Sequence, residues 1–417
     1  MSSIPRAVTR TVAAAAILAG AVACSDHFLN VLNPNVIDAG TVDPTADATT
    51  LANSAQQNYA VAYGWMIMYS SWMSGETLVA ETFPTRNEFG RRDISDLNGN
   101  LNTDLWQPIS LAAASTKIVL DLNLPTPASN LNYARAATFR GYSFLSMATD
   151  FCSGTVSSGP ELTTSRLLDS AVFWFGKAMD LGNANGTADG KALASAALAG
   201  RARANLQRGN KAAAAADAAA VPAGFVFNIN YTDDLNNRTR LGNRMWQYTS
   251  DRGSISIAPA YRVNDPRMLF KAPGEHTLTP QDPSSGPFFI EQKYPGFGSP
   301  IRLASKLEAD YIAAEASGDP VKQLVFINAQ RSANQQPAYS GPTDANSVLT
   351  ELMGQRALEF YLEGRRLADF RRNPNNVTNV PVAGSAYFKP GFSPVGSNTC
   401  YPIPRPEKDN NPNFPRP

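Results

Sequence analysis

The segment that decides the fold is Val348 to Arg372, which reads VLTELMGQRALEFYLEGRRLADFRR. Apolar and charged residues recur along it with helical spacing, and Gly364 interrupts the pattern, so we expect two helices that meet near this glycine. Glu359, Glu363 and Arg366 follow one another at steps of four and three, which would place them on one helix face, where opposite charges can pair. We therefore expect a structural ion-pair network that holds the last two helices together.

This segment resembles the signature of the SusD/RagB family of nutrient-binding outer-membrane lipoproteins. The family pattern is an arginine, a Glu-Phe pair, then Glu-Gly-x-Arg and Asp-x-x-Arg. The positions in this chain that match the family pattern are Arg356, Glu359-Phe360, Glu363, Gly364, Arg366, Asp369 and Arg372.

Arginines beside Glu359 and Glu363 keep both carboxylates ionised, whereas the acid of a glycosidase needs a raised pKa. We therefore reject Glu359 and Glu363 as a catalytic pair.

Further matches follow in family order. The closing Pro-Ile-Pro-x-x-Glu and Asn-Pro run of the family is similar to Tyr401-Pro402-Ile403-Pro404-Arg405-Pro406-Glu407 with Asn411-Pro412-Asn413. Weaker matches are Phe28-Leu29, the run 309–316, Asn328 and Arg331.

The resemblance implies a mainly α fold of tetratricopeptide-like helix pairs with a large irregular loop and short-strand insertion. It also implies a receptor without catalytic activity. Such a receptor binds an oligomeric nutrient, above all a glycan, at the cell surface and delivers it to a TonB-dependent outer-membrane transporter of the SusC type.

Our interpretation of the chain itself agrees with one SusD-like domain over 51–417. Helical spacing covers 51–221 and 305–372, and 190–221 loosely follows the tetratricopeptide pattern. The insertion 222–304 is punctuated by prolines and contains two possible strands, Phe225 to Ile229 and Ser254 to Ile257. The tail 373–417 is rich in proline, so we expect it to run extended. The expected helices are 51–81, 104–122, 132–149, 167–181, 190–208, 211–220, 305–317, 321–333 and 346–372.

The N-terminus has the pattern of an export signal. Arg6 and Arg10 precede an apolar run that is shorter than the roughly 20 residues that span a bilayer. The run ends in small residues before Cys24, which resembles the lipobox of bacterial lipoproteins. We therefore expect a signal peptide at 1–23, fatty-acid chains on Cys24 as the membrane anchor, and a tether over 24–50.

Composition argues against several other classes of function. The formal net charge is +1, so the basic patches that bind nucleic acid are not expected. The chain has two His and three Cys without the spacing of a zinc site, and we expect neither a metal nor a cofactor.

With Cys24 acylated, Cys152 and Cys400 remain as an even pair in an exported chain. We predict a disulfide between them, with two buried free thiols as the alternative.

Candidate ligand-binding residues come from two stretches that combine aromatic rings with polar groups, which is what sugar recognition requires. One stretch spans 69–86 and the other spans 243–252, and a Gly-Pro loop near Tyr294 could form a rim. Core packing is the alternative for Trp246, and we expect Trp106 and Trp174 in the core. The candidates are Trp72, Glu76, Arg86, Trp246, Tyr248, Asp251, Arg252 and Tyr294.

Two other functions stay open as alternatives. Stacked helix pairs could form a scaffold that binds a periplasmic peptide or protein. A lipid-anchored glycosidase would have to draw its carboxylates from Asp233, Asp234, Asp251 or Glu291 in the insertion, and these show no catalytic spacing. We therefore predict that the protein is not an enzyme.

Overall fold

The computed structural model describes residues 43–415. The predicted signal peptide, the lipid anchor Cys24 and the Phe28-Leu29 pair lie outside the described residues. The chain from Ala48 onward forms one compact unit. No helix among the described residues has the length and apolarity that a membrane span requires.

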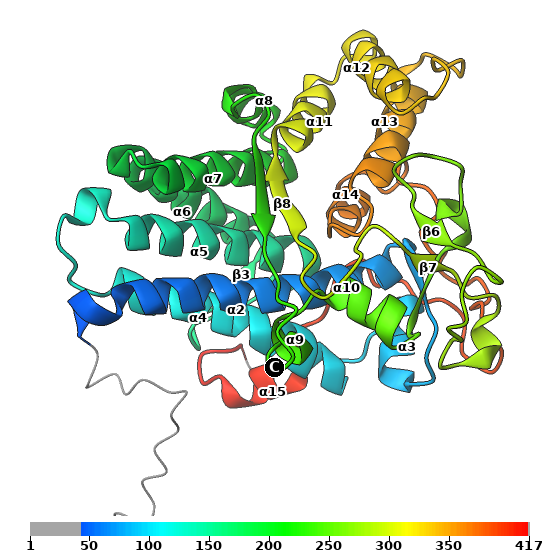
Figure 1. The fold of residues 1–417 in the computed structure, drawn as a ribbon, viewed down its shortest axis with the longest axis horizontal. Coiled ribbons are helices and arrows are strands. Elements are labelled where there is room, and N and C mark those ends of the chain that lie inside the picture. Colours follow the sequence, from blue (N-terminus) through cyan, green and yellow to red (C-terminus); the bar gives the residue numbers. More distant parts are fainter. Residues whose placement is uncertain (1–42, 416–417) are drawn as a thin grey trace, which may run out of the picture. The chain divides into compact units, whose positions relative to one another are not determined.

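Helices dominate the unit, as predicted. The long helix α2 (Pro44–Met73) is followed by α4 (Gln107–Leu120), α5 (Leu131–Asp150), α6 (Thr164–Asn185), α7 (Ala188–Gln207) and α8 (Lys211–Ala220). From α4 to α8, each of these helices packs against the next one in the chain. In Figure 1, α4 to α8 lie at the opposite end of the unit from the short strands β6 (Phe270–Lys271) and β7 (Ile290–Glu291).

Small residues allow α5, α6 and α7 to approach closely. A Cβ atom at Gly141 of α5 or at Gly200 of α7 would lie 2.7 Å or 2.5 Å from the ring of Phe175 on α6. The α6–α7 turn is defined by Gly186, at φ 72°, and by the Thr187 side chain, which accepts a hydrogen bond from the Gly190 N–H. These local signals explain why the helix pairs could be predicted.

The second helical part contains α11 (Lys306–Ser317), α12 (Pro320–Ala333), α13 (Ala345–Glu359) and α14 (Arg366–Arg372). The break near Gly364 is present. Leu362 (φ 56°) and Gly364 (φ 69°) both adopt left-handed conformations, so the residues between Glu359 and Arg366 are not helical. The prediction that Glu359, Glu363 and Arg366 share one helix face is therefore wrong.

Four two-stranded antiparallel pairs complete the fold of residues 43–415. β1 (Thr77–Val79) pairs with β5 (Ile255–Ile257), and β4 (Val226–Ile229) pairs with β8 (Ile301–Ser305). The shorter pairs are β2 (Ser153–Gly154) with β3 (Leu162–Thr163) and β6 (Phe270–Lys271) with β7 (Ile290–Glu291). Short helices and helical turns are α3 (Pro84–Gly90), η3 (Leu101–Trp106), η4 (Pro127–Ser129), α9 (Arg238–Leu241), α10 (Arg244–Trp246), η5 (Gln247–Asp251), η6 (Pro259–Tyr261), η7 (Pro283–Ser285) and α15 (Arg405–Asn410).

Three predicted boundaries need correction. The first helix begins at Pro44 instead of Leu51, so the last residues of the predicted tether are helical. The first helix ends at Met73 instead of Glu81, because Gly75 turns the chain at φ 76° and the next residues pair with β5. The proline-rich tail contains α15, although we expected it to be extended throughout. Pro406 lies in the first turn of α15, where backbone N–H groups have no partner within the helix, so proline is tolerated there.

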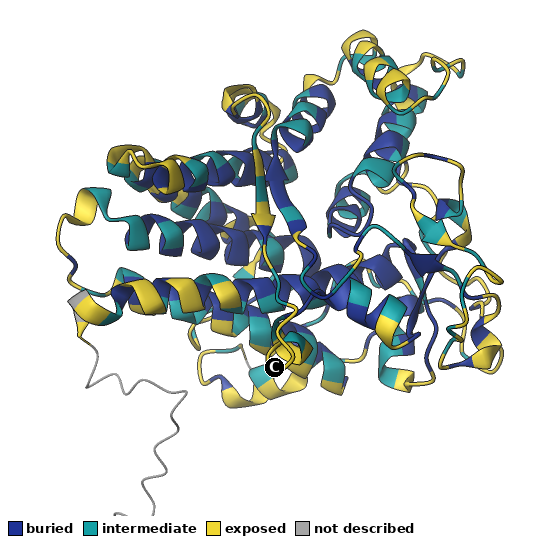
Figure 2. Ribbon diagram, viewed as in Figure 1, coloured by how far each residue is buried: buried dark blue, intermediate teal, exposed yellow. Residues whose placement is uncertain are grey.

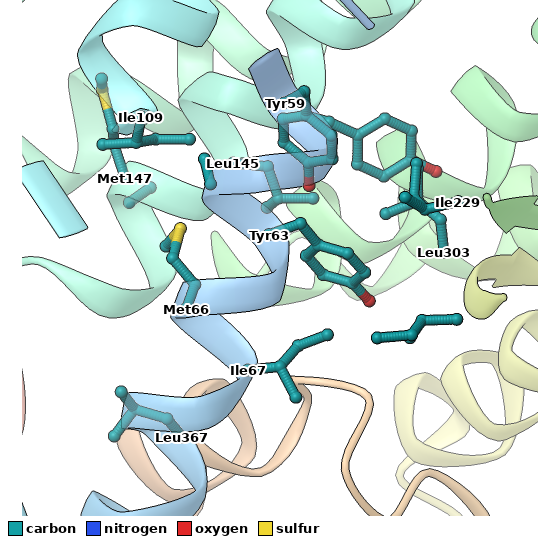
Figure 3. Close-up of a cluster of buried hydrophobic side chains, with 14 of the residues drawn as sticks. Tyr59, Tyr63, Met66, Ile67, Ile109, Leu145, Met147, Ile229, Leu303 and Leu367 are labelled. Atoms are coloured by element: carbon teal, nitrogen blue, oxygen red, sulfur yellow. The ribbon is translucent and has the colours of Figure 1, made fainter. Parts of the chain in front are cut away.

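The core surrounds the second half of α2. Tyr59, Tyr63, Met66 and Ile67 project from this helix toward side chains of α5, β4, β8 and α14, and Figure 3 shows Leu145, Ile229, Leu303 and Leu367 around them. Each fully buried side chain of this size contributes about 1.5–3 kcal/mol. The first half of α2 keeps an exposed face, whereas the second half is mostly buried (Figure 2).

A disulfide joins Cys152, just after α5, to Cys400 in the tail, with a Cα–Cα distance of 5.1 Å. Beside it, Cys152 donates its N–H to the Tyr401 carbonyl (2.9 Å), and Tyr401 donates its N–H to the Asp150 carbonyl (2.8 Å). The bridge closes a loop of 248 residues, which in the loop-entropy model destabilises the unfolded chain by roughly 5 kcal/mol. The tail is thereby fixed to the helical part.

Candidate functional site

Arg356 of the signature is one of three arginines that surround a buried carboxylate, Glu308 at the start of α11. Arg203 binds both of its oxygens, at 2.7 and 2.6 Å, and the Arg365 Nε lies 3.0 Å from one of them. Arg356 adds a fourth contact at 3.7 Å. Burial alone would raise the pKa of Glu308, but the three arginines outweigh it and lower the pKa to about 2. We call Glu308, Arg203, Arg356 and Arg365 the Glu308 hub.

The remaining signature residues extend this network. Arg356 pairs with Asp369 at 2.8 Å, and Arg372 pairs with both Asp369 (2.8 Å) and Glu315 (2.6 Å). Because these pairs join α11, α13 and α14, the network holds several helices together.

Glu359 and Glu363 pair with residues of the insertion. Arg302 lies 3.1 Å from Glu359 and 3.0 Å from Glu363, and the Lys293 Nζ lies 2.7 Å from Glu363. Burial would raise the pKa of Glu363, yet these cations lower it. Arg366 donates to the Thr378 carbonyl. Glu359 and Glu363 therefore pair with cations that are distant in sequence, and not with Arg366 as expected.

Three of the predicted ligand residues are in the core and present no surface to a glycan. Trp72 is 1% exposed and Tyr294 is 4% exposed. The Tyr294 hydroxyl donates to the Leu362 carbonyl (2.9 Å), and the carboxylate of Glu76 accepts the Leu362 N–H (3.0 Å). Burial raises the pKa of Glu76 to about 7. The turn around Leu362 therefore covers Tyr294 and Glu76, and all three candidates are buried.

Arg86, Tyr248 and Arg252 come together although they belong to the two separate predicted stretches. The guanidinium carbons of Arg86 and Arg252 lie 4.9 and 4.8 Å from the centre of the Tyr248 ring. Both arginines donate to the Tyr248 hydroxyl at 3.2 Å. Arg86 is half-buried and also binds both oxygens of Glu81, whereas Arg252 is exposed. Tyr248 itself is buried, so it presents the two guanidinium groups and cannot stack on a ligand.

Trp65 and Arg244 complete this group and were missed by the sequence analysis. Arg244 lies 4.3 Å from the ring centre of the half-buried Trp65, which packs edge-on against Tyr248 at 5.5 Å. Arg244 donates to the carbonyls of Thr239 and Arg240 and to Gln247, and within the described chain it has no carboxylate at ion-pair distance. Trp65 lies outside the two stretches considered as ligand-binding, so it was not among the candidates. We call Trp65, Arg86, Arg244, Tyr248 and Arg252 the arginine–aromatic cluster.

A groove of about 450 Å³ adjoins this cluster along the first half of α2. Gly64 of α2 lies beside both the cluster and the groove. A Cβ atom at this position would lie 3.1 Å from the Arg244 side chain and 3.4 Å from the hydroxyl of Tyr231, which lines the groove. Its described lining carries no charged side chain. We call this hollow the α2 groove; it is lined by Thr50, Asn53, Ser54, Gln56, Gln57, Ala60, Val61, Ile229, Asn230, Tyr231, Thr232 and Leu241.

Trp246 and Asp251 lie outside the cluster. Trp246 packs on Phe297 with a ring distance of 4.5 Å and borders the main core, which fits the alternative of core packing. Asp251 is exposed at the end of η5. Neither residue lines the α2 groove.

The loop carboxylates considered for a glycosidase stabilise loops. Glu291 is buried and accepts hydrogen bonds from the Tyr294 N–H (3.0 Å) and from Thr249 (3.3 Å). Asp233 accepts the Gly298 N–H (2.7 Å), and Asp234 accepts the Asn236 N–H (2.8 Å). Among the described residues, no group of three or more His, Cys, Asp or Glu side chains could hold a metal ion.

Comparisons with known proteins support the fold. No protein-family model and no curated sequence matches the chain. A SusD superfamily protein from Bacteroides vulgatus aligns with a TM-score of 0.66 and 15% identity, over 90% of this chain and 98% of its own. A SusD-like carbohydrate-binding protein from Bacteroides fragilis gives 0.65 and 14%, over 88% and 98%. A laminarin-binding SusD-like protein gives 0.64 and 14%, over 88% and 98%. The fold is therefore that of the SusD superfamily, as the sequence resemblance implied.

Proposed function

We propose that this chain with a SusD-like fold is a non-catalytic cell-surface lipoprotein that binds an oligomeric glycan. In this proposal the α2 groove and the arginine–aromatic cluster form the binding surface. The bound nutrient is then delivered to a TonB-dependent outer-membrane transporter of the SusC type.

The observation that carries the proposal is the proximity of the uncharged groove to the cluster, since Tyr231 of the groove and Arg244 of the cluster both lie beside Gly64. Side-chain amides such as Asn53 and Gln57 both donate and accept hydrogen bonds, as sugar hydroxyls require. The rings of Trp65 and Tyr231 and the guanidinium groups at the adjoining end provide apolar faces and further donors. From Thr50 to Trp65 the helix extends by roughly 22 Å, which suits an extended oligomer better than a single sugar.

The names of the structural neighbours support a carbohydrate ligand, since one is described as laminarin-binding and others as carbohydrate-binding. The absence of catalysis is supported by the environment of the candidate carboxylates. Glu359 and Glu363 are paired with arginine or lysine, and Asp233, Asp234 and Glu291 bind loop backbone. The lipobox at Cys24 supports anchoring to a membrane.

The proposal is tested by measuring binding of the purified mature chain to a panel of soluble glycans and oligopeptides. We expect a glycan to bind, and we expect Gln57→Ala or Trp65→Ala to weaken its binding about tenfold or more. Phe173→Ala, which removes an exposed ring on α6, is the matched control and should bind as the wild type does.

Two results would overturn the proposal. Binding of a peptide alone, unaffected by the groove variants, would favour a scaffold for a peptide or protein partner. Cleavage of the bound glycan by the pure protein would contradict a non-catalytic role. Recovery of a large barrel protein with the native, membrane-extracted chain tests delivery separately.

A further inference from the structure

A second cavity, of about 170 Å³, lies between the end of α2, strand β1, helix α3 and the tail. It shares no lining residue with the α2 groove or the arginine–aromatic cluster. Its walls are mainly apolar, and the tail contributes two aromatic rings. The lining residues that carry the argument are Trp72, Val79, Tyr387, Phe388 and Val395.

The tail segment that closes this cavity is held firmly in place. Lys389, beside the cavity, donates to the Glu81 carbonyl at 2.7 Å and pairs with Asp282 at 2.9 Å, with its side chain fully buried. Arg92 donates to the carbonyls of Pro381 and Asn398. The walls are therefore formed before any ligand arrives, which favours affinity because little ordering is needed on binding.

The polar groups that line the cavity are satisfied, with one exception. The Thr77 hydroxyl bonds to Ser71 (2.6 Å), the Ser385 hydroxyl donates to the Val382 carbonyl (2.7 Å), and the Tyr387 hydroxyl donates to Asn87 (3.0 Å). The indole N–H of Trp72 is buried and has no acceptor among the described residues. Buried donors are nearly always paired, so the N–H of Trp72, a residue that lines the cavity, is a donor available to a ligand.

We propose that this cavity is a second binding site for a small apolar group, about the size of one aromatic ring, that carries a hydrogen-bond acceptor. Apolar cavities of roughly 150 Å³ accept a benzene ring in other proteins, so the volume is suitable. The rings of Tyr387 and Phe388 contact the apolar body of the ligand. The Trp72 N–H donates to its carbonyl or ether oxygen. The site is independent of glycan binding at the α2 groove.

The test compares two probes of similar shape, acetophenone, which has a carbonyl acceptor, and ethylbenzene, which has none. Binding to the mature chain is followed by the indole N–H resonances of the 15N-labelled protein, and the Trp72 resonance is identified by its loss in Trp72→Phe. We expect acetophenone to shift this resonance and to bind about fivefold more tightly than ethylbenzene, the gain of one hydrogen bond.

Two variants keep the test decisive. Trp72→Phe retains a ring without the donor, so ethylbenzene should bind as before while the preference for acetophenone disappears. Ala386→Trp, at an exposed position that lines the cavity, should block both probes without disturbing the core. The proposal is overturned if neither probe perturbs Trp72, if both bind the wild type equally, or if the preference survives in Trp72→Phe.

Discussion

The Glu308 hub and the arginine–aromatic cluster each contain three arginines, but the two regions surround them differently. In the hub, Arg203, Arg356 and Arg365 converge on one buried carboxylate. In the cluster, the buried Arg244 lies over the ring of Trp65, and Arg86 and the exposed Arg252 lie over the ring of Tyr248. The hub uses its charges to join helices, whereas the cluster leaves the guanidinium group of Arg252 able to contact a ligand.

The difference lies in what neutralises each arginine. The Arg365 side chain is 4% exposed and borders Glu308, so the positive charge is compensated within the fold. Arg244 donates to backbone carbonyls and to a neutral amide, and Arg252 is exposed beside the Tyr248 hydroxyl. An arginine that stacks on a ring and binds neutral oxygens can still bind the hydroxyl or acidic groups of a sugar.

The largest expected effect comes from removing the charge at the centre of the hub. Glu308→Gln leaves three buried guanidinium groups around a neutral side chain, and loss of one partner of a buried ion pair costs about 3–5 kcal/mol. The measurement is the free energy of unfolding by denaturant, with the disulfide intact. The control is Asp310→Asn on the same helix, which removes a part-exposed pair with Lys306 and should cost about 0.5 kcal/mol. Equal effects of the two substitutions would show that the hub does not stabilise the fold.

Lowering the pH should remove the stability that the Glu308 hub contributes. The pKa of Glu308 falls from 4.5 to about 2 on folding, so its contribution to stability is complete above pH 4.5 and is lost as the pH falls toward 2. We expect the midpoint of thermal unfolding to fall over this range. Glu308→Gln should flatten that decline, and an unchanged decline would assign acid sensitivity to other groups.

The buried carboxyls of Glu76, Asp150 and Glu291 should give the opposite slope at higher pH. Burial raises the pKa of each to about 7, so the folded state binds more protons than the unfolded state between about pH 4 and 7. Their effect is to increase stability as the pH is lowered through this range. The decline in stability of the wild type and of Glu308→Gln is therefore best compared below pH 4.

The smallest effect on stability is expected at the cluster. Arg252→Gln removes an exposed guanidinium and should change the free energy of unfolding by less than about 0.5 kcal/mol. The same change should weaken binding of the glycan found with the panel by about tenfold, since hydrogen bonds to charged groups are strong. Arg166→Gln, at an exposed position on α6, is the control for both measurements. A large loss of stability in Arg252→Gln would erase the distinction between the two regions.

Regular helices could be predicted because their signals are local. The helix Lys211–Ala220 has the predicted bounds, since Asn210 caps its start and Pro222 follows its end. The pairs of strands in the insertion are mostly too short to show a period of two, and they are fixed by partners such as β8, far along the chain.

The candidate site was only partly predictable for the same reason. Arg86, Tyr248 and Arg252 combined residue types that signal binding, and the structure brings them together. Trp65 lay outside the two stretches considered, and the candidate Trp72 is buried, because helical spacing does not show which neighbours will cover a given face. The partners of Glu308 likewise depend on packing between helices that are distant in sequence.

The bridge between Cys152 and Cys400 links the early helices to a cysteine that is synthesised after every residue of the Glu308 hub. It can close only when residues up to 400 have been made and the tail has reached the end of α5. A free thiol at Cys152 thus marks a molecule whose last segment has not yet docked. The covalent link can therefore form only late in synthesis, and it restrains the finished fold.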